Sequence, residues 1–197
     1  MPMQVDLVDL LREEMIAVGL DCTNAEDVIR QLASLLIERD CVEDGFAEDV
    51  IDREKVYPTG LPTRPVAVAL PHADPDHVKK TSLALGVLRS PVAFGEMGSD
   101  GSTTVQAQIV ILMAIKEREK QVKMLQAIAR VFQSPDVLAS LAASANAPVI
   151  AEQELNRFLN SDNISRLILI QVVNHGGQGS RLATARGAGY QDEPSWL

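Results

Sequence analysis

Cysteine and histidine are scarce in this chain of 197 residues, with two and three copies. Cys22 and Cys41 are far apart and flanked by acids, so the sequence indicates neither a disulfide framework nor a zinc site. The longest apolar runs, such as IVILMAI at 109–115, are much shorter than the roughly 20 residues that cross a bilayer. Residues 1–14 carry two acids before any apolar run develops, so we expect no secretory signal. These absences predict a cytoplasmic protein.

Basic charge is also in short supply. Lysine and arginine number 18 against 27 aspartates and glutamates, which gives a formal net charge of −9. This balance disfavours nucleic-acid and anionic-membrane binding, because both need a basic footprint. The composition, 46% hydrophobic and 23% charged, is typical of a soluble globular protein. At this length we expect one sizeable core rather than several domains.

Hydrophobic periodicity predicts a succession of strands and helices. Strands are expected at 15–22, 66–70, 81–88 and 104–115, and helices at 23–40, 46–55, 116–132, from 134 onward and at 150–160. The segment 104–115 begins alternating and ends continuously apolar, as expected of a central strand buried on both faces. Thr23 or Asn24 is the predicted N-cap of the first helix.

The composition changes after residue 160. Residues 161–197 hold five of the twelve glycines, and apart from RLILIQVV at 166–173 they lack periodicity. They carry three arginines against three acids, so the whole net charge of −9 belongs to residues 1–160. We therefore predict a domain over 1–160 and a glycine-rich, loosely ordered tail over 161–197.

The segment VAVALPHADPDH at 66–77 holds two of the three histidines. Pro71 restrains Leu70 to extended conformations and cannot donate to a sheet, so it marks the end of a strand. His72 is then expected at the end of a buried strand, where open α/β sheets bind ligands. A neutral imidazole is a competent nucleophile that can carry a phosphoryl group on nitrogen. On the local sequence alone, an ordinary polar loop residue is the simplest interpretation of His72.

A metal site is an alternative for the same segment, formed by His72, Asp74, Asp76 and His77. Histidines five residues apart match neither the i, i+4 helix pair nor the usual zinc-finger spacings. Asp74 to Asp76 also reads as an ordinary turn and helix start. We therefore expect no metal, and no nucleotide cofactor either, because no GxxxxGK[ST] phosphate loop occurs.

The segment DREKVYPTGLPTRPVAVALPHADPDHVKKTSLALGVLRSPVAFGE at 52–96 resembles the IIA domain of the fructose/mannitol class of the bacterial sugar phosphotransferase system. Within that class it looks most like the galactitol-type IIA proteins. The matching residues are Arg53-Glu54, Pro58-Thr59-Gly60 and ALPHA around His72, followed by SPVAFGE and VILMAIKEREKQVKMLQAIA. The similarity covers about residues 10–158.

This resemblance implies roles for single residues. His72 stands where the family's phosphorylated histidine stands, and would accept phosphate from the phosphocarrier protein HPr. Arg53 matches an arginine that supports the site, and a guanidinium fits a phosphoryl group as a planar charged fork. The alternative for Arg53 is a solvated cation at a helix end. Thr59 and Gly60 would shape the loop facing His72, or form a plain turn after Pro58.

Gln121 marks a departure from the mannitol- and fructose-type relatives, which often carry a second histidine near this place. Glutamine donates a hydrogen bond but cannot become cationic. The difference favours the galactitol-type branch, with Gln121 as a supporting residue, unless Gln121 is simply a surface residue.

Pattern and resemblance together predict a three-layer α/β/α sandwich, a mixed β-sheet flanked by helices. The expected function is a phosphocarrier IIA component for a galactitol-like polyol, served by HPr. Neither DCTNAED nor DCVEDGF looks like a phosphate-accepting cysteine loop, so the acceptor cysteine is expected on a separate IIB chain, with membrane IIC involved only indirectly. A free-standing regulatory IIA that binds proteins in a phosphorylation-dependent way is the alternative. A structural α/β interaction protein with an unreactive His72 is the third reading.

Overall fold

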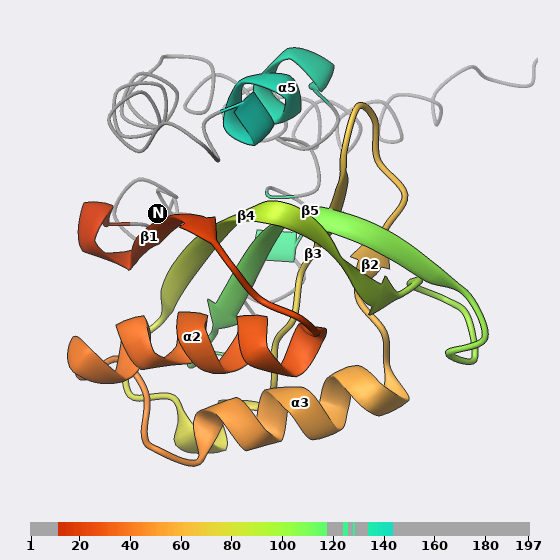
Figure 1. The fold of residues 1–197 in the computed structure, drawn as a ribbon. Helices are drawn as coiled ribbons and strands as arrows, with labels where there is room; N and C mark the ends of the chain where they lie inside the picture. Colours follow the sequence, from red (N-terminus) through yellow and green to blue (C-terminus); the bar gives the residue numbers. More distant parts are fainter. Residues whose placement is uncertain (1–11, 118–123, 126–127, 129–133, 144–197) are drawn as a thin grey trace, which may run out of the picture.

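The computed structural model describes residues 12–117, 124–125, 128 and 134–143. In chain order the elements are the 3-10 helix η1 (Glu13–Met15), β1 (Ile16–Leu20), α2 (Ala25–Glu38), α3 (Phe46–Val56), β2 (Gly60–Leu61), β3 (Ala67–Ala69), the 3-10 helix η2 (Pro75–His77), β4 (Ser82–Gly95), β5 (Thr104–Ala114) and α5 (Pro135–Ala143) (Figure 1). Within this part of the chain, no helix has the length and apolar character needed to span a membrane.

Five strands form one open sheet in the order β1-β4-β5-β3-β2. β1 is parallel to β4 and β3 is parallel to β5, whereas the β4–β5 and β2–β3 pairs are antiparallel. The sheet is therefore mixed, as predicted. β5 lies at its centre, and the second half of β5 is buried on both faces, in agreement with its continuous apolar run.

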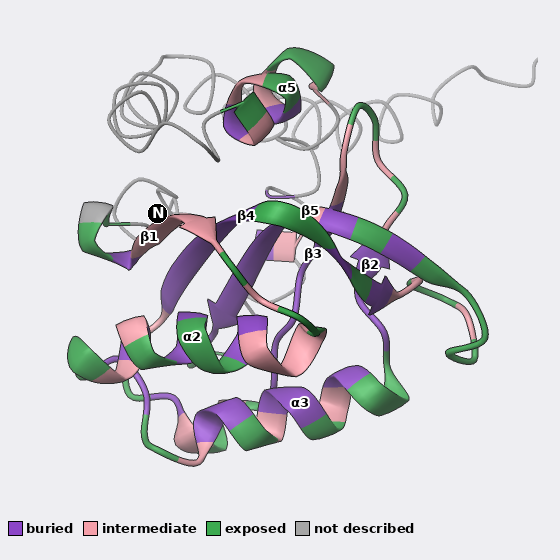
Figure 2. Cartoon of the chain, in the orientation of Figure 1, coloured by how far each residue is buried: buried purple, intermediate pink, exposed green. Residues whose placement is uncertain are grey.

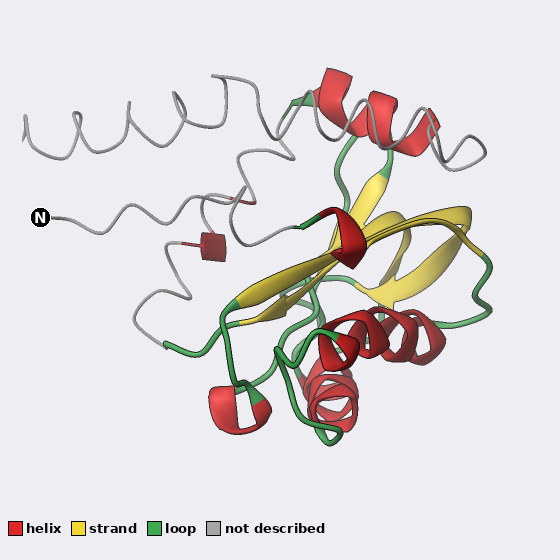
Figure 3. Cartoon of the chain, turned by 90° about the vertical axis from the view of Figure 1, so that its left-hand side faces the viewer, coloured by secondary structure: helices red, strands yellow, loops and turns green. Residues whose placement is uncertain are grey.

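Helices cover both faces of this sheet (Figures 1 and 3). α2 and α3 pack on one face and α5 lies over the other, so the buried side chains form two cores (Figure 2). The core under α2 and α3 includes Leu32, Leu36, Phe46, Val50 and Phe94, and the core under α5 includes Leu70, Leu83, Ile109, Met113 and Leu138. The predicted three-layer α/β/α sandwich is confirmed.

The helix starts follow the local sequence. The Asn24 side chain accepts a hydrogen bond from the Asp27 N–H at 2.9 Å, which satisfies a donor in the first turn of α2 and confirms the predicted cap. α5 starts at Pro135, as expected of a proline at the first helical position. The backbone N–H of Leu138 donates to the Ser134 carbonyl at 3.3 Å, which closes the first turn of α5.

The sheet also contains strand residues that the pattern does not predict. β4 continues to Gly95, well beyond the expected end at residue 88, because the β4–β5 ladder shifts register between Val87 and Val92 and then resumes. Pro91 lies within this irregular stretch, where its missing N–H removes no ladder bond. β2 is only two residues long and lies in a proline-rich segment that reads as a turn.

Several expectations fall on residues that the structure does not describe. These are the helix at 150–160, the domain limit at 160, the tail at 161–197 and Gln121. Within the expected helix 116–132, the described residues Met124, Leu125 and Ile128 are helical, but Lys116 and Glu117 are not, so the predicted start at residue 116 is wrong.

Candidate functional site

His72 lies directly beyond the end of β3, alongside the last residues of β5. The backbone N–H of Met113 donates to the Pro71 carbonyl at 3.0 Å, and His72 forms an isolated parallel bridge with Met113. The end of β5 therefore holds the backbone segment that carries His72. His72 is 7% exposed, so the polar-loop interpretation underestimates how firmly the ring is packed.

One ring nitrogen of His72 has a fixed task. Nδ1 lies 2.9 Å from the Leu70 carbonyl oxygen, and because a carbonyl can only accept, Nδ1 must carry the proton. In the neutral ring, the lone pair is then on Nε2. Burial lowers the pKa of His72, and the positive charge of Arg53 lowers it further, against the opposing effects of the Leu70 carbonyl and Asp74. His72 is therefore a neutral, Nδ1-protonated imidazole at neutral pH.

Arg53 lies in the last turns of α3, one of the two helices that pack on the same face of the sheet. Its positive charge acts on His72, where it adds to the effect of burial in lowering the pKa of the ring. The guanidinium carbon lies 5.4 Å from the ring centroid of Tyr57, a cation–π distance. Tyr57 is largely exposed and Arg53 is half-buried, so the guanidinium is partly open to solvent.

Thr59 reaches His72 indirectly, through Leu70. The Leu70 N–H donates to Thr59 Oγ1 at 3.2 Å, while the Leu70 carbonyl accepts the His72 Nδ1–H. Thr59 in turn is held by Glu54, whose two carboxylate oxygens accept from the Thr59 N–H at 2.9 Å and the Thr59 hydroxyl at 2.8 Å. Glu54 of α3 is thus linked to the His72 ring through hydrogen bonds to Thr59 and to the two backbone groups of Leu70.

No role for Glu54 follows from the resemblance beyond its place beside Arg53. The spacing of residues in α3 nevertheless indicates that Glu54 is buried. Glu54 lies four residues after Val50 and three after Ile51, so it is an acid on the apolar face of α3, and it is buried with them. A carboxyl at such a position needs hydrogen-bond donors nearby, and the Thr59 N–H and hydroxyl supply them.

Gly60 has a packing role. A Cβ atom at this position would lie 2.6 Å from the Gly95 carbonyl oxygen and 2.5 Å from a methyl group of Val105. The Gly60 carbonyl also accepts from the Met97 N–H at 2.7 Å. Glycine is therefore required where β2 meets the β4–β5 hairpin, and none of these contacts involves the loop that carries His72.

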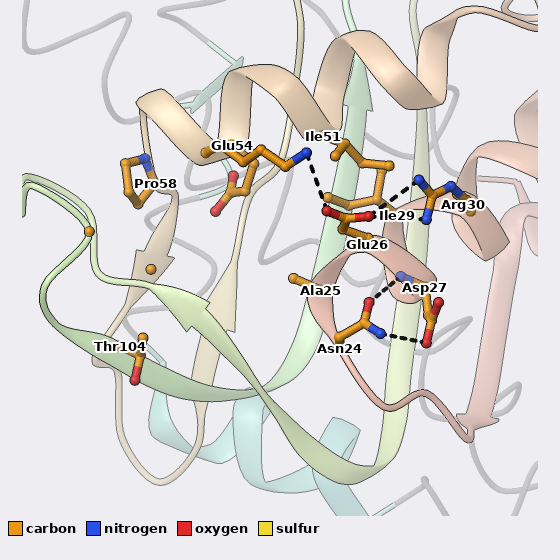
Figure 4. Close-up of a pocket in the computed structure, with 13 residues that line it drawn as sticks. Asn24, Ala25, Glu26, Asp27, Ile29, Arg30, Ile51, Glu54, Pro58 and Thr104 are labelled. Atoms are coloured by element: carbon orange, nitrogen blue, oxygen red, sulfur yellow. Dashed lines mark hydrogen bonds and ion pairs between the residues drawn. The ribbon is translucent and has the colours of Figure 1, made fainter.

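A surface cavity of about 560 Å³ lies between the first turn of α2, the end of α3 and the β4–β5 hairpin (Figure 4). Glu54 lines it, but His72 does not. Two cations line the cavity, Lys55 and Arg30. Each forms an ion pair with Glu26 at 3.3 Å. The cavity is thus separate from the His72 ring.

The two histidines of the metal alternative each use a ring nitrogen in another way. His77 binds the Asp49 carboxylate through Nδ1, while His72 Nδ1 binds the Leu70 carbonyl. In the part of the chain that the structure describes, no group of three or more His, Cys, Asp or Glu side chains is arranged to hold a metal ion.

Glu54 gives a testable dependence of stability on pH. Burial raises the pKa of Glu54 from 4.5 to about 7, although the Thr59 hydrogen bonds oppose this shift. The folded state thus binds this proton more tightly than the unfolded state, so the free energy of unfolding falls as the pH rises from about 4.5 through 7. The loss is on the order of 3 kcal/mol, because the pKa of Glu54 differs between the folded and unfolded states by the interval from 4.5 to about 7.

We expect Glu54→Gln to lose this dependence, because an amide does not ionise. In urea unfolding at pH 5 to 8, the free energy of unfolding of the variant should increase relative to that of the wild type as the pH rises. Glu48→Gln, an exposed acid on the same helix, is the matched control and should run parallel to the wild type. Parallel curves for Glu54→Gln as well would mean that Glu54 titrates at its ordinary pKa.

Comparison with known proteins gives a consistent result. Residues 9–160 match the family model described as phosphoenolpyruvate-dependent sugar phosphotransferase system, EIIA 2. The chain is 24% identical over 123 residues to the galactitol-specific EIIA component of Escherichia coli K12, which covers 62% of this chain and 81% of that protein.

Two solved structures share the fold. The complex of enzyme IIA and phosphorylated enzyme IIB for mannitol from Escherichia coli matches with a TM-score of 0.62 and 23% identity, over 76% of this chain and 98% of that one. The crystal structure of IIA mannitol from Escherichia coli matches with a TM-score of 0.61 and 24% identity, over 75% and 97%. With its model matched over residues 9–160, the chain belongs to the EIIA 2 family of the phosphoenolpyruvate-dependent sugar phosphotransferase system and is a phosphotransfer protein.

Proposed function

We propose that this chain is the IIA phosphocarrier of a galactitol-type system, which accepts a phosphoryl group from HPr on Nε2 of His72 and passes it to a cysteine of a separate IIB chain. The single observation that carries the proposal is the bond from Nδ1 of His72 to the Leu70 carbonyl. It commits one nitrogen of a neutral ring to the backbone and leaves the nucleophilic lone pair on the other.

Phosphoryl transfer asks for in-line positioning and for stabilisation of charge. The Nε2 lone pair forms the new N–P bond as the bond between phosphorus and the donor nitrogen of HPr breaks. The Nδ1 proton stays on the ring, and its bond to the Leu70 carbonyl stabilises the positive charge that the ring gains. Arg53 pairs with the phosphoryl oxygens. In the second transfer a thiolate sulfur of IIB forms the S–P bond, the Nε2–P bond breaks and His72 returns to its neutral form.

The pKa of His72 matches this task. A protonated imidazole has no lone pair to offer, so a pKa below the ordinary value keeps the nucleophile available throughout the neutral range. The source of the shift is burial together with the charge of Arg53. Arg53 therefore serves twice, since the charge that would hold the phosphoryl group also keeps its acceptor unprotonated.

The partners follow from the same surface and from the relatives. Val56 and Tyr57, 65% and 64% exposed, lie at the C-terminal end of α3, three and four residues after Arg53, and offer apolar contact to a docking protein. A structural neighbour is a complex of a mannitol IIA with its phosphorylated IIB, which supports a IIB partner. The relative named galactitol-specific supports the polyol class. Membrane IIC would be reached only through IIB.

The test uses the purified chain with phosphoenolpyruvate, enzyme I and HPr. We expect one acid-labile phosphate per chain, on His72, and its transfer to the cysteine of a galactitol-type IIB in a second step. Failure of the wild-type chain to take up phosphate would overturn the phosphocarrier role. Uptake without transfer to any polyol IIB would instead favour the regulatory alternative.

A further inference from the structure

The segment 72–77, which we call the phosphoacceptor loop, is hydrogen-bonded to α3 at its end and is under the influence of an α3 charge at its start. At the end of the loop, His77 Nδ1 is hydrogen-bonded to the Asp49 carboxylate. At its start, the charge of Arg53 acts on His72. Asp49 and Arg53 are four residues apart on α3, so they lie on the same face of the helix, one turn from each other. One face of α3 therefore carries both the residue bonded to the end of the loop and the charge that acts on its start.

His77 is seated by more than this one bond. A Cβ atom at Gly45, just before α3, would lie 2.8 Å from Cε1 and 2.9 Å from Nε2 of His77, so the ring packs directly on the backbone there. The His77 carbonyl accepts from the Glu43 N–H at 2.9 Å, and Val78 forms an isolated bridge with Val42. The His77 ring that binds Asp49 is thus also packed against the backbone at Gly45, which fixes its orientation.

The charges around His77 favour its cationic form. The hydrogen bond and charge of Asp49 raise the pKa of His77, and Glu43 and Asp76 act in the same direction. These three carboxylates come from α3, from the α2–α3 connection and from the loop itself. The attraction between His77 and Asp49 is complete below the ordinary histidine pKa, and weakens as the pH rises through the raised value.

We propose that Asp49 and His77 are a positioning pair, which fastens the end of the phosphoacceptor loop to α3 so that His72 at its start keeps its place relative to Arg53. The inference rests on the phosphocarrier function proposed above. Phosphoryl transfer depends on alignment, and a displacement of about 1 Å can cost on the order of 10²-fold in rate. Release of one loop end, with the Leu70 and Met113 contacts still holding the other, should cost less, roughly tenfold.

The experiment measures single-turnover phosphorylation by phosphorylated HPr over a range of donor concentrations and from pH 6 to 9. Asp49→Asn and His77→Gln should each lower the maximal rate roughly tenfold with little change in the half-saturating HPr concentration. The double variant should lose no more than either single variant, because the residues act as one unit. The advantage of the wild type over Asp49→Asn should shrink as the pH rises through the raised His77 pKa.

Asp52→Asn is the matched control, because Asp52 is an exposed acid on the same helix with an ion pair to Lys55. It should match the wild type. Equal rates for Asp49→Asn and Asp52→Asn would overturn the proposal, as would losses that multiply in the double variant, since these would indicate two independent effects.

A second readout does not need phosphate transfer. Nuclear magnetic resonance titration of the His72 ring should show a changed pKa in Asp49→Asn and an unchanged one in Asp52→Asn, because the distance from His72 to Arg53 changes only in the first. If the wild-type chain accepts no phosphate, the proposed function fails, and this titration still decides whether the pair positions the ring. An unchanged His72 titration in Asp49→Asn would overturn the pair's role in either case.

Discussion

Replacement of His72 by alanine should abolish phosphoryl acceptance, because Nε2 of His72 is the proposed attacking atom. The chain should remain folded. His72 is buried, however, and alanine removes the hydrogen bond to the Leu70 carbonyl, so the loss of stability should be about 1 to 2 kcal/mol rather than the few tenths typical of a surface histidine. His72→Asn is the better companion variant, since an asparagine amide can donate to Leu70 but cannot hold phosphate.

Phosphate uptake from phosphorylated HPr, read by intact mass and by acid lability, measures the effect, with circular dichroism to confirm folding. His77→Ala and His175→Ala, which replace the other two histidines of the chain, are the matched controls. Both should still be phosphorylated, with His77→Ala slower if the pair with Asp49 positions the loop. Uptake by His72→Ala together with none by His77→Ala would show that the acceptor has been assigned to the wrong ring.

The position of His72 could be predicted from sequence because its causes are local. Pro71 cannot donate to a sheet, so it ends β3 at Ala69 wherever that strand lies, and the next side chain emerges at the strand end. The cap of α2 is local in the same sense, since Asn24 and Asp27 are three residues apart. Features of this kind need no knowledge of distant parts of the chain.

The burial of His72 and the role of Glu54 could not be predicted in the same way. The segment around His72 is polar, yet His72 is buried where the chain bridges to Met113, which is distant in sequence. Thr59 becomes a support for Leu70 only because β2 pairs with β3 and places the two side by side. A buried acid on α3 can be recognised from its spacing, but its partner cannot, since the partner depends on how the helix meets the sheet.

The length of β4 also could not be predicted from local sequence. Pro91 and its polar neighbours indicate a loop, and the strand nevertheless continues, because the long β5 ladder resumes after one irregularity. Local chemistry predicts where a strand can be interrupted. Whether β4 resumes depends on its partner strand. Here β5 is long enough to offer further backbone groups that need hydrogen-bond partners.

Arg53→Lys should give a folded chain that transfers phosphate on the order of 10²-fold more slowly, because it removes an arranged stabiliser of the transferred group. Lysine keeps the positive charge but loses the planar fork that pairs with two phosphoryl oxygens and lies against the Tyr57 ring. Single-turnover transfer from phosphorylated HPr measures the effect. Arg39→Lys, at an exposed arginine after α2, is the control and should leave the rate unchanged.

A second substitution separates the two contributions of Arg53. Arg53→Gln also removes the positive charge that lowers the pKa of His72, so the pKa should rise towards its ordinary value and the rate should fall further at mildly acidic pH, as more of the ring is protonated. In Arg53→Lys the charge remains, so the His72 titration should stay close to that of the wild type while the rate falls. Unchanged kinetics in Arg53→Lys would reduce Arg53 to a source of charge. Unchanged kinetics in both variants would leave it a surface cation, and the phosphoryl group would then be stabilised by the backbone and the docked partner alone.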